Sequence, residues 1–88
     1  MFETSLAQNY PNPFNPRTTI AYTLAKEGQA RLEIFDAAGH SVAMLVDGVV
    51  GAGKHAVDFD ASSLSSGIYF YRLTAEGIVQ QKKMVLLK

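Results

Sequence analysis

Short runs of alternating apolar and polar residues recur along this chain, and turn-forming residues separate each run from the next. Such alternation places every second side chain on the same face of an extended strand. Because no segment shows a long helical period, the sequence predicts an all-β fold. The expected strands cover residues 17–24, 30–35, 41–47, 54–60, 68–75 and 78–88, with a weaker one at residues 2–8.

The even spacing of these runs narrows the fold further. They start about ten residues apart, which is typical of small antiparallel sandwiches. A half-buried strand keeps its apolar residues on one parity, so the sequence also specifies the faces. Residues expected to share a face are Phe2 and Leu6; Thr18, Ile20, Tyr22 and Leu24; Ala30, Leu32 and Ile34; Val42, Met44 and Val46; and His55, Val57 and Phe59. We therefore predict an immunoglobulin-like antiparallel β-sandwich of about seven strands.

Turn-forming residues indicate where two of the strand pairs reverse. Residues 36–39 begin with Asp36 and end with Gly39. This pattern suits a type I turn closed by a glycine in the left-handed region. Gly48 and the glycines of residues 51–53 are expected to mark a further reversal.

The C-terminal segment predicts a β-hairpin. Its two strands flank Glu76-Gly77, and a two-residue turn ending in glycine is typical of hairpins. If Ala75 pairs with Ile78, the register divides the hairpin into a core face and a mixed outer face. The core face holds Tyr69, Tyr71, Leu73, Ile78, Met84 and Leu86, with Gln80 and Lys82. The outer face holds Ile68, Phe70, Arg72, Thr74, Val79, Gln81, Lys83, Val85 and Leu87, and it is too apolar to be only a solvated surface.

Residues 9–16 combine three prolines with three asparagines. Proline fixes φ, removes a backbone donor and restricts the residue before it, so neither a helix nor a central strand is expected here. Tyr10 and Phe14 are the expected anchors that hold this rigid connector on the sandwich. The Asn-Pro-Phe tripeptide also suits a peptide ligand, so a recognition role for the segment stays open.

Composition limits the domain organisation and the classes of partner. The 88 residues suffice for one core, so we expect a single domain over residues 1–88, with a strand and proline-rich connector at 1–17 and the main sandwich at 18–88. Eight basic residues balance eight acidic ones, which gives no net field toward nucleic acid or an anionic membrane. The chain has no cysteine and no apolar run long enough for a transmembrane segment. No secretory signal peptide is visible, so an exported domain is expected to depend on a signal in a larger parent chain.

Positive charge gathers late in the chain. From Arg72 onward, four basic residues stand against a single acidic one, Glu76. Two interpretations stay open: the lysines protect an edge strand against pairing with other chains, or they contact an anionic partner.

No residue pattern indicates catalysis, a cofactor or a metal. His55 lies on the apolar parity of its strand, where a core histidine is expected, and His40 follows a turn glycine and is expected to be exposed. The chain has no nucleophile elbow, phosphate-binding glycine loop or histidine pair with metal-binding spacing. Asp58 and Asp60 share a strand face and offer oxygens of the kind that calcium binds, but solvated carboxylates are the simpler interpretation. The chain is predicted not to be an enzyme.

Four segments together resemble a known family. They are residues 8–16, QNYPNPFNP; 32–42, LEIFDAAGHSV; 64–72, LSSGIYFYR; and 82–88, KKMVLLK. They are similar to the motifs of the C-terminal sorting domain (type A) of cargo proteins of the bacterial type IX secretion system, over residues 6–88. The motif positions are Tyr10, Pro11, Asn12, Pro13, Phe14, Asp36, Gly39, Gly67 and Tyr69. His40 departs from the family, which usually has arginine after the glycine, and this weakens the transfer of a cationic contact to that position.

The resemblance implies a sorting signal at the C-terminus of a larger secreted protein. The cargo domain, N-terminal to this one, is expected to pass through the periplasm by an ordinary export signal before the outer-membrane translocon recognises the sorting domain. A sortase-like peptidase is then expected to remove the domain and join the cargo to surface lipopolysaccharide. In other lineages the domain stays attached and holds the cargo at the cell surface, so the expected location is the surface or the extracellular space.

We expect the export machinery to read the C-terminal hairpin. The expected recognition residues are Phe70, Lys82, Lys83, Val85, Leu87 and Lys88. The alternative is a non-catalytic structural or adhesive immunoglobulin-like module that serves cell attachment, glycan binding or self-association. Related modules occur in flagellar hook-capping proteins, so the fold alone does not select between these functions.

Overall fold

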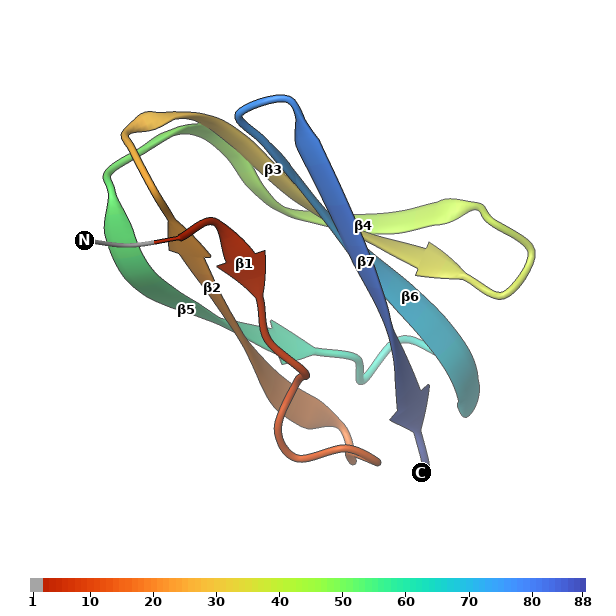
Figure 1. The fold of residues 1–88 in the computed structure, drawn as a ribbon. Helices are drawn as coiled ribbons and strands as arrows, with labels where there is room; N and C mark the ends of the chain where they lie inside the picture. Colours follow the sequence, from red (N-terminus) through yellow and green to blue (C-terminus); the bar gives the residue numbers. More distant parts are fainter. Residues whose placement is uncertain (1–2) are drawn as a thin grey trace.

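The computed structural model describes residues 3–88, which form seven strands and no helix (Figure 1). The strands are β1 (Ser5–Leu6), β2 (Arg17–Leu24), β3 (Gly28–Asp36), β4 (Ser41–Val50), β5 (Gly53–Asp60), β6 (Gly67–Ala75) and β7 (Ile78–Leu86). Leu6 is buried, whereas Phe2, which was expected to share its face, lies outside the described residues. This part of the chain contains no helix long and apolar enough to cross a membrane.

The strands form two antiparallel sheets that pack against each other (Figure 1). One sheet has the order β1-β2-β5 and the other the order β4-β3-β6-β7. At the connection between β5 and β6, the Tyr69 hydroxyl donates a hydrogen bond to the carbonyl oxygen of Ser65 at 2.7 Å. A tyrosine that bonds back to the backbone at this corner is typical of immunoglobulin-like sandwiches. The predicted fold class is confirmed.

The core lies between the sheets and uses the parities that the sequence predicts for most strands. The inward residues of β2 and β3 are buried: Thr18, Ile20, Tyr22, Leu24, Ala30, Leu32 and Ile34. On β5, Phe59 is buried, while Val57 and His55 are half buried. The sheet with β6 and β7 contributes Tyr69, Tyr71, Leu73, Ala75, Met84 and Leu86.

β4 departs from the predicted alternation. Its register against β3 shifts at two points, which places an extra residue in β4 at each of them. Such bulges move the side chains that follow to the opposite face. Val42 and Met44 are therefore exposed, while Val46 packs against the core, so the prediction that these three residues share a face is wrong. The expected reversal is confirmed at residues 51–53, between β4 and β5, but Gly48 is not part of it, because β4 continues through Gly48 to Val50.

The proline segment joins the two sheets. The Phe14 side chain is only 2% exposed, and its ring centroid lies 6.4 Å from that of Phe59. Phe14 is therefore the anchor that the sequence predicts. Tyr10 is not, because its side chain is 81% exposed. The backbone of Tyr10 pairs with Thr19 through two 3.0 Å hydrogen bonds, and this extended pairing turns the neighbouring Asn9 inward and Tyr10 outward.

Candidate functional site

The hairpin of β6 and β7 has the turn and register expected from its sequence. Glu76 and Gly77 have φ angles of 55° and 72°, the pair of positive values that a type I′ turn requires. Ala75 lies opposite Ile78, as predicted. This register fixes which side chains of the two strands are neighbours across the hairpin.

The inner face of the hairpin belongs to the core along most of its length. Tyr71, Leu73 and Met84 are buried there. Ile78, which was also expected in this core, is 43% exposed, because it adjoins the turn at the end of the sheet. Lys82 lies on the same face opposite Tyr71 and is half buried.

The outer face brings apolar side chains beside a lysine. Phe70 lies opposite Lys83, and Ile68 lies opposite Val85. Phe70 and Val85 are half buried, whereas Lys83 and Ile68 are exposed. Leu87 follows β7 on the same parity and is 55% exposed. We call the group of Phe70, Lys83, Val85 and Leu87 the outer patch.

Arg72 forms the border of the outer patch. Its guanidinium carbon lies 4.4 Å from the centroid of the Phe35 ring, a cation–π contact. Its Nε and a terminal nitrogen also donate to Gln81 Oε1 at 3.2 and 3.1 Å. These contacts hold the arginine side chain between Phe35 of β3 and Gln81 of β7.

Two of the expected recognition residues lie away from the outer patch. Lys82 is on the opposite face of β7. The Lys88 ammonium donates to the carbonyl oxygen of Ser62 at 2.6 Å, and its backbone N–H donates to Ser66 Oγ at 2.9 Å. The structure therefore brings together four of the six expected residues, and Lys88 instead fastens the chain end to the loop before β6.

Residues 4–14, which we call the N-terminal clasp, run along the free edge of β7. Gln8 Nε2 donates to the carbonyl oxygen of Lys83 at 2.8 Å, and Asn12 Oδ1 accepts from the N–H of Val85 at 3.0 Å. The Phe14 N–H donates to the Val85 carbonyl at 2.9 Å, and the Phe14 carbonyl accepts from the N–H of Leu87 at 3.0 Å. The clasp thus takes the place of a neighbouring strand beside the C-terminal part of β7.

Buried polar groups fasten the clasp to the core, and sequence reasoning missed them. Asn9 Nδ2 donates to Thr18 Oγ1 at 3.0 Å and to the Pro11 carbonyl at 3.2 Å. The Asn9 N–H donates to the hydroxyl of Tyr71, which donates in turn to the Ala7 carbonyl at 2.7 Å. Burial raises the pKa of Tyr71 above its ordinary value. The available signal was the run of asparagines, since their side chains often bond to nearby backbone groups.

The motif residues Asp36 and Gly39 form the predicted turn between β3 and β4. Gly39 has a φ of 90°, and its N–H donates to the Asp36 carbonyl at 3.0 Å. Asp36 Oδ1 accepts from the backbone N–H groups of His40 and Ala38 at 2.9 and 3.0 Å. The hydrogen bond from the His40 backbone N–H is the main reason why the pKa of Asp36 lies below its usual value. The exposed His40 ring lies 3.5 Å from the other carboxylate oxygen.

We expect Asp36→Ala to destabilise the domain in a pH-dependent way. Because the pKa of Asp36 is lowered in the folded state, its contribution is complete above the unfolded pKa and is lost as the pH falls through the folded pKa. The difference in urea midpoint between wild type and variant should be largest above about pH 5 and shrink toward pH 2. A difference that stays constant with pH would contradict the role of the carboxylate.

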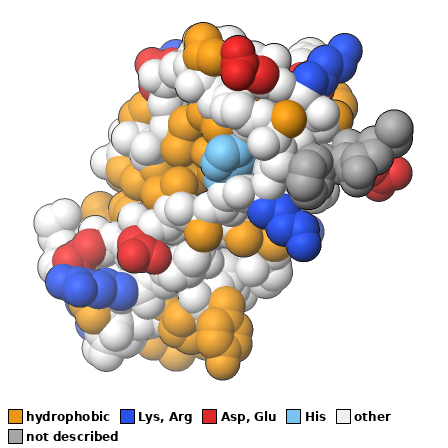
Figure 2. Space-filling model, turned by 90° about the vertical axis from the view of Figure 1, so that its left-hand side faces the viewer, with side chains coloured by type: hydrophobic (Ala, Val, Ile, Leu, Met, Phe, Trp, Pro, Cys, Tyr) orange, Lys and Arg blue, Asp and Glu red, His pale blue; other side chains and the backbone are white. Residues whose placement is uncertain are grey.

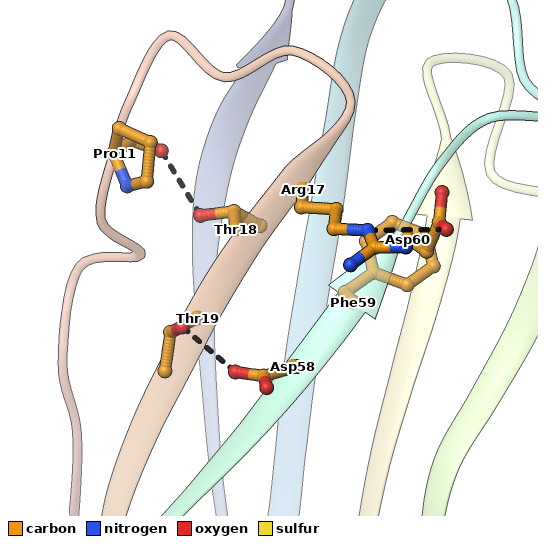
Figure 3. Close-up of a pocket in the computed structure, with 7 residues that line it drawn as sticks. All are labelled: Pro11, Arg17, Thr18, Thr19, Asp58, Phe59 and Asp60. Atoms are coloured by element: carbon orange, nitrogen blue, oxygen red, sulfur yellow. Dashed lines mark hydrogen bonds and ion pairs between the residues drawn. The ribbon is translucent and has the colours of Figure 1, made fainter.

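A shallow depression of about 400 Å³ lies between the proline segment and the ends of β2 and β5 (Figure 3). Its carboxylates are already engaged: Asp58 accepts from Thr19 Oγ1 at 2.9 Å, and Asp60 pairs with Arg17 at 3.4 Å. Asp60 also accepts from Ser62, and this contact is the main cause of its lowered pKa. Residues 3–88 hold no cluster of three or more potential metal ligands.

The side of the molecule that lies to the left in Figure 1 shows hydrophobic side chains around a histidine (Figure 2). On β5, the His55 ring stacks on Tyr22 with 5.2 Å between the centroids, and its Nε2 lies 2.7 Å from the Gly51 carbonyl. Half-buried apolar residues of β4 and β5, including Leu45 and Val57, pack against the core. His55 therefore has a structural role, with its polar atom bonded to the β4–β5 turn.

Comparison with known proteins assigns the family. Residues 8–87, nearly the whole chain, match the family described as "Secretion system C-terminal sorting domain". No curated protein matches the chain. Domains of this family are non-catalytic signals that direct a cargo protein through type IX secretion, across the outer membrane and toward the cell surface. The fold and the four sequence motifs agree with this match, and the chain belongs to the family of secretion system C-terminal sorting domains.

Proposed function

We propose that the export machinery recognises this sorting domain through the outer patch of the C-terminal hairpin. The observation that carries this proposal is the cross-strand arrangement of Phe70 beside Lys83 and of Ile68 beside Val85 on one accessible sheet face. Interfaces commonly depend on a few apolar or aromatic anchors surrounded by polar groups. The outer patch offers apolar anchors of this kind, with Lys83 as the one charged residue beside them.

The contacts of each residue support different roles within this proposal. Phe70 and Val85 are the anchors, because they are half buried and therefore lose little side-chain freedom on binding. Lys83 steers a partner of opposite charge. Leu87 extends the apolar surface toward the chain end. Lys82 and Lys88 lie away from the outer patch, since one is on the other face of β7 and the other is bonded to the β5–β6 loop, so in this proposal they contribute positive charge rather than direct contacts.

We further propose that residues 1–88 act as one folded unit in the passage of the cargo. A cargo domain N-terminal to this one crosses the periplasm with it, and the outer-membrane translocon then binds the outer patch. A sortase-like peptidase separates the cargo from the domain and joins the cargo to surface lipopolysaccharide. The clasp supports the single-unit proposal, because it ties the N-terminal residues to both sheets through Phe14 and Asn9.

Two substitutions in the outer patch test the proposed surface. We expect Lys83→Glu and Val85→Ser to reduce surface delivery of a reporter protein fused to the domain in a host with type IX secretion. The matched controls are Lys54→Glu, an exposed lysine on β5, and Val49→Ser, a valine on β4 that is 72% exposed. All four fusions should first show wild-type β-structure by circular dichroism. Reporter exposed on the cell surface is then measured by protease accessibility.

The comparison between patch and control variants decides the outcome. Reduced delivery with Lys83→Glu and Val85→Ser, and unchanged delivery with both controls, is the expected result. If the folded patch variants deliver as much reporter as wild type, recognition lies on another surface. Equal losses in all four variants would show a general effect of surface change and would also contradict the proposal.

A further inference from the structure

The register of the hairpin determines which backbone groups of β7 face its free edge. β7 pairs with β6 on one side. In an antiparallel pair, every second residue exchanges both backbone hydrogen bonds with its partner, and in a two-residue hairpin the first such pair flanks the turn. Because Ala75 pairs with Ile78, the even-numbered residues of β7 bond to β6, and the odd-numbered ones point their N–H and C=O outward. The clasp bonds agree, since they go to Lys83, Val85 and Leu87.

The clasp divides this edge into a covered part and an open part. Between Lys83 and Leu87, the Lys83 carbonyl, the N–H and carbonyl of Val85 and the Leu87 N–H are bonded to Gln8, Asn12 and Phe14. Nearer the turn, no backbone partner within residues 3–88 reaches the outward groups of Val79 or Gln81. The Val79 side chain is 60% exposed and Gln81 is also exposed. Between them, the Gln80 side chain on the inner face donates to the Thr4 carbonyl at 3.3 Å and accepts from the Leu6 N–H at 3.0 Å. The clasp therefore holds the Gln80 side chain here but leaves the outward backbone groups of Val79 and Gln81 open.

We propose that the open edge, residues 79–83, accepts an extended segment of the export machinery as an added strand. This inference rests on the proposed function and deepens it, because it states how a partner reaches the outer patch. An added strand gains affinity from main-chain hydrogen bonds and specificity from alternate side chains. The clasp ends the pairing at Lys83, so the added strand is short and continues over the outer patch rather than along β7.

The charges at the open edge select an acidic segment. Lys82 and Lys83 lie at its end and form no ion pair within the described part of the chain. Glu76, the only carboxylate of the hairpin, accepts a hydrogen bond from the hydroxyl of Thr4. Opposite charges on adjacent strands stabilise their pairing. The occupant is therefore a strand with Asp or Glu beside the lysines.

Gln81→Pro tests the added strand with little disturbance of the hairpin. Proline removes the outward N–H of residue 81 but none of the bonds between β6 and β7, and it is tolerated on edge strands. Gln81→Ala is the matched control, because it also removes the contact with Arg72 but keeps the N–H. Val79→Pro is a second variant, at an exposed side chain.

Amide hydrogen exchange of the wild-type domain first tests whether the edge is open. We expect fast exchange at Val79 and Gln81 and slow exchange at Val85 and Leu87, whose N–H groups are bonded to the clasp. Slow exchange at all four amides would overturn the inference. Delivery of the fused reporter is then compared for the variants, and we expect about tenfold less with Gln81→Pro and Val79→Pro than with Gln81→Ala, which corresponds to one or two lost main-chain bonds.

The outcomes separate this inference from the proposed function. If folded Gln81→Pro delivers as much reporter as Gln81→Ala, strand addition is overturned, while wild-type delivery still supports recognition by the outer patch. If the wild-type fusion is not delivered, both fail. Sedimentation gives the remaining outcome: a wild-type dimer that Gln81→Pro abolishes would show that a second copy of the domain occupies the edge, which contradicts an acidic segment of the machinery.

Discussion

Phe14→Ala is expected to lower the free energy of unfolding by about 3–5 kcal/mol, the usual loss for a fully buried phenylalanine. The Phe14 ring is 2% exposed and packs near Phe59 of β5. Its removal therefore leaves a cavity between the sheets. A domain of this size has a total stability of only about 4–13 kcal/mol. The substitution therefore removes a large fraction of it and lowers the melting temperature by more than about 10 °C.

Denaturant unfolding of three variants separates the packing of this ring from other effects of the proline segment. Phe14→Leu retains most of the buried volume and should cost less than about 1.5 kcal/mol. Tyr10→Ala, in the same segment, should change stability by less than about 0.5 kcal/mol because the ring is exposed. A similarly small loss with Phe14→Ala would show that the ring is not buried in solution, and would return the segment to consideration as a peptide ligand.

The predicted strands and the hairpin register could be read from the sequence because they depend on local patterns. β2 keeps one alternation from Thr18 to Leu24, and every inward side chain is buried. The Glu76-Gly77 turn fixes the pairing of β6 and β7 within a few residues of itself. In both cases the residues that decide the structure are close together in the chain.

The features that were missed depend on residues far apart in the chain. The bulges in β4 follow from its fit against β3, and nothing in the alternation of β4 itself marks them. The choice between Tyr10 and Asn9 as the inward residue depends on the pairing of Tyr10 with Thr19 and on the buried hydroxyl of Tyr71. The aromatic Tyr10 was the expected anchor. Asn9 is buried in its place because its polar groups are satisfied by hydrogen bonds.

The candidate site was predicted only in part for the same reason. Parity placed Phe70, Lys83 and Val85 on one face of the hairpin, and the structure agrees. The sequence did not show that the clasp covers the edge of β7 from Lys83 onward, since those bonds join residues more than 70 positions apart. Nor did it show that Lys88 is bonded to the β5–β6 loop.

Delivery of a reporter by the wild-type domain tests the sorting function most directly. A reporter with an ordinary export signal is fused to the N-terminus of residues 1–88 and produced in a host with type IX secretion. The same host lacking the outer-membrane translocon, and the reporter without the domain, are the controls. We expect the fusion to reach the cell surface or the medium only when both the domain and the translocon are present. If the folded wild-type fusion stays in the periplasm of the competent host, these 88 residues are not a sufficient sorting signal.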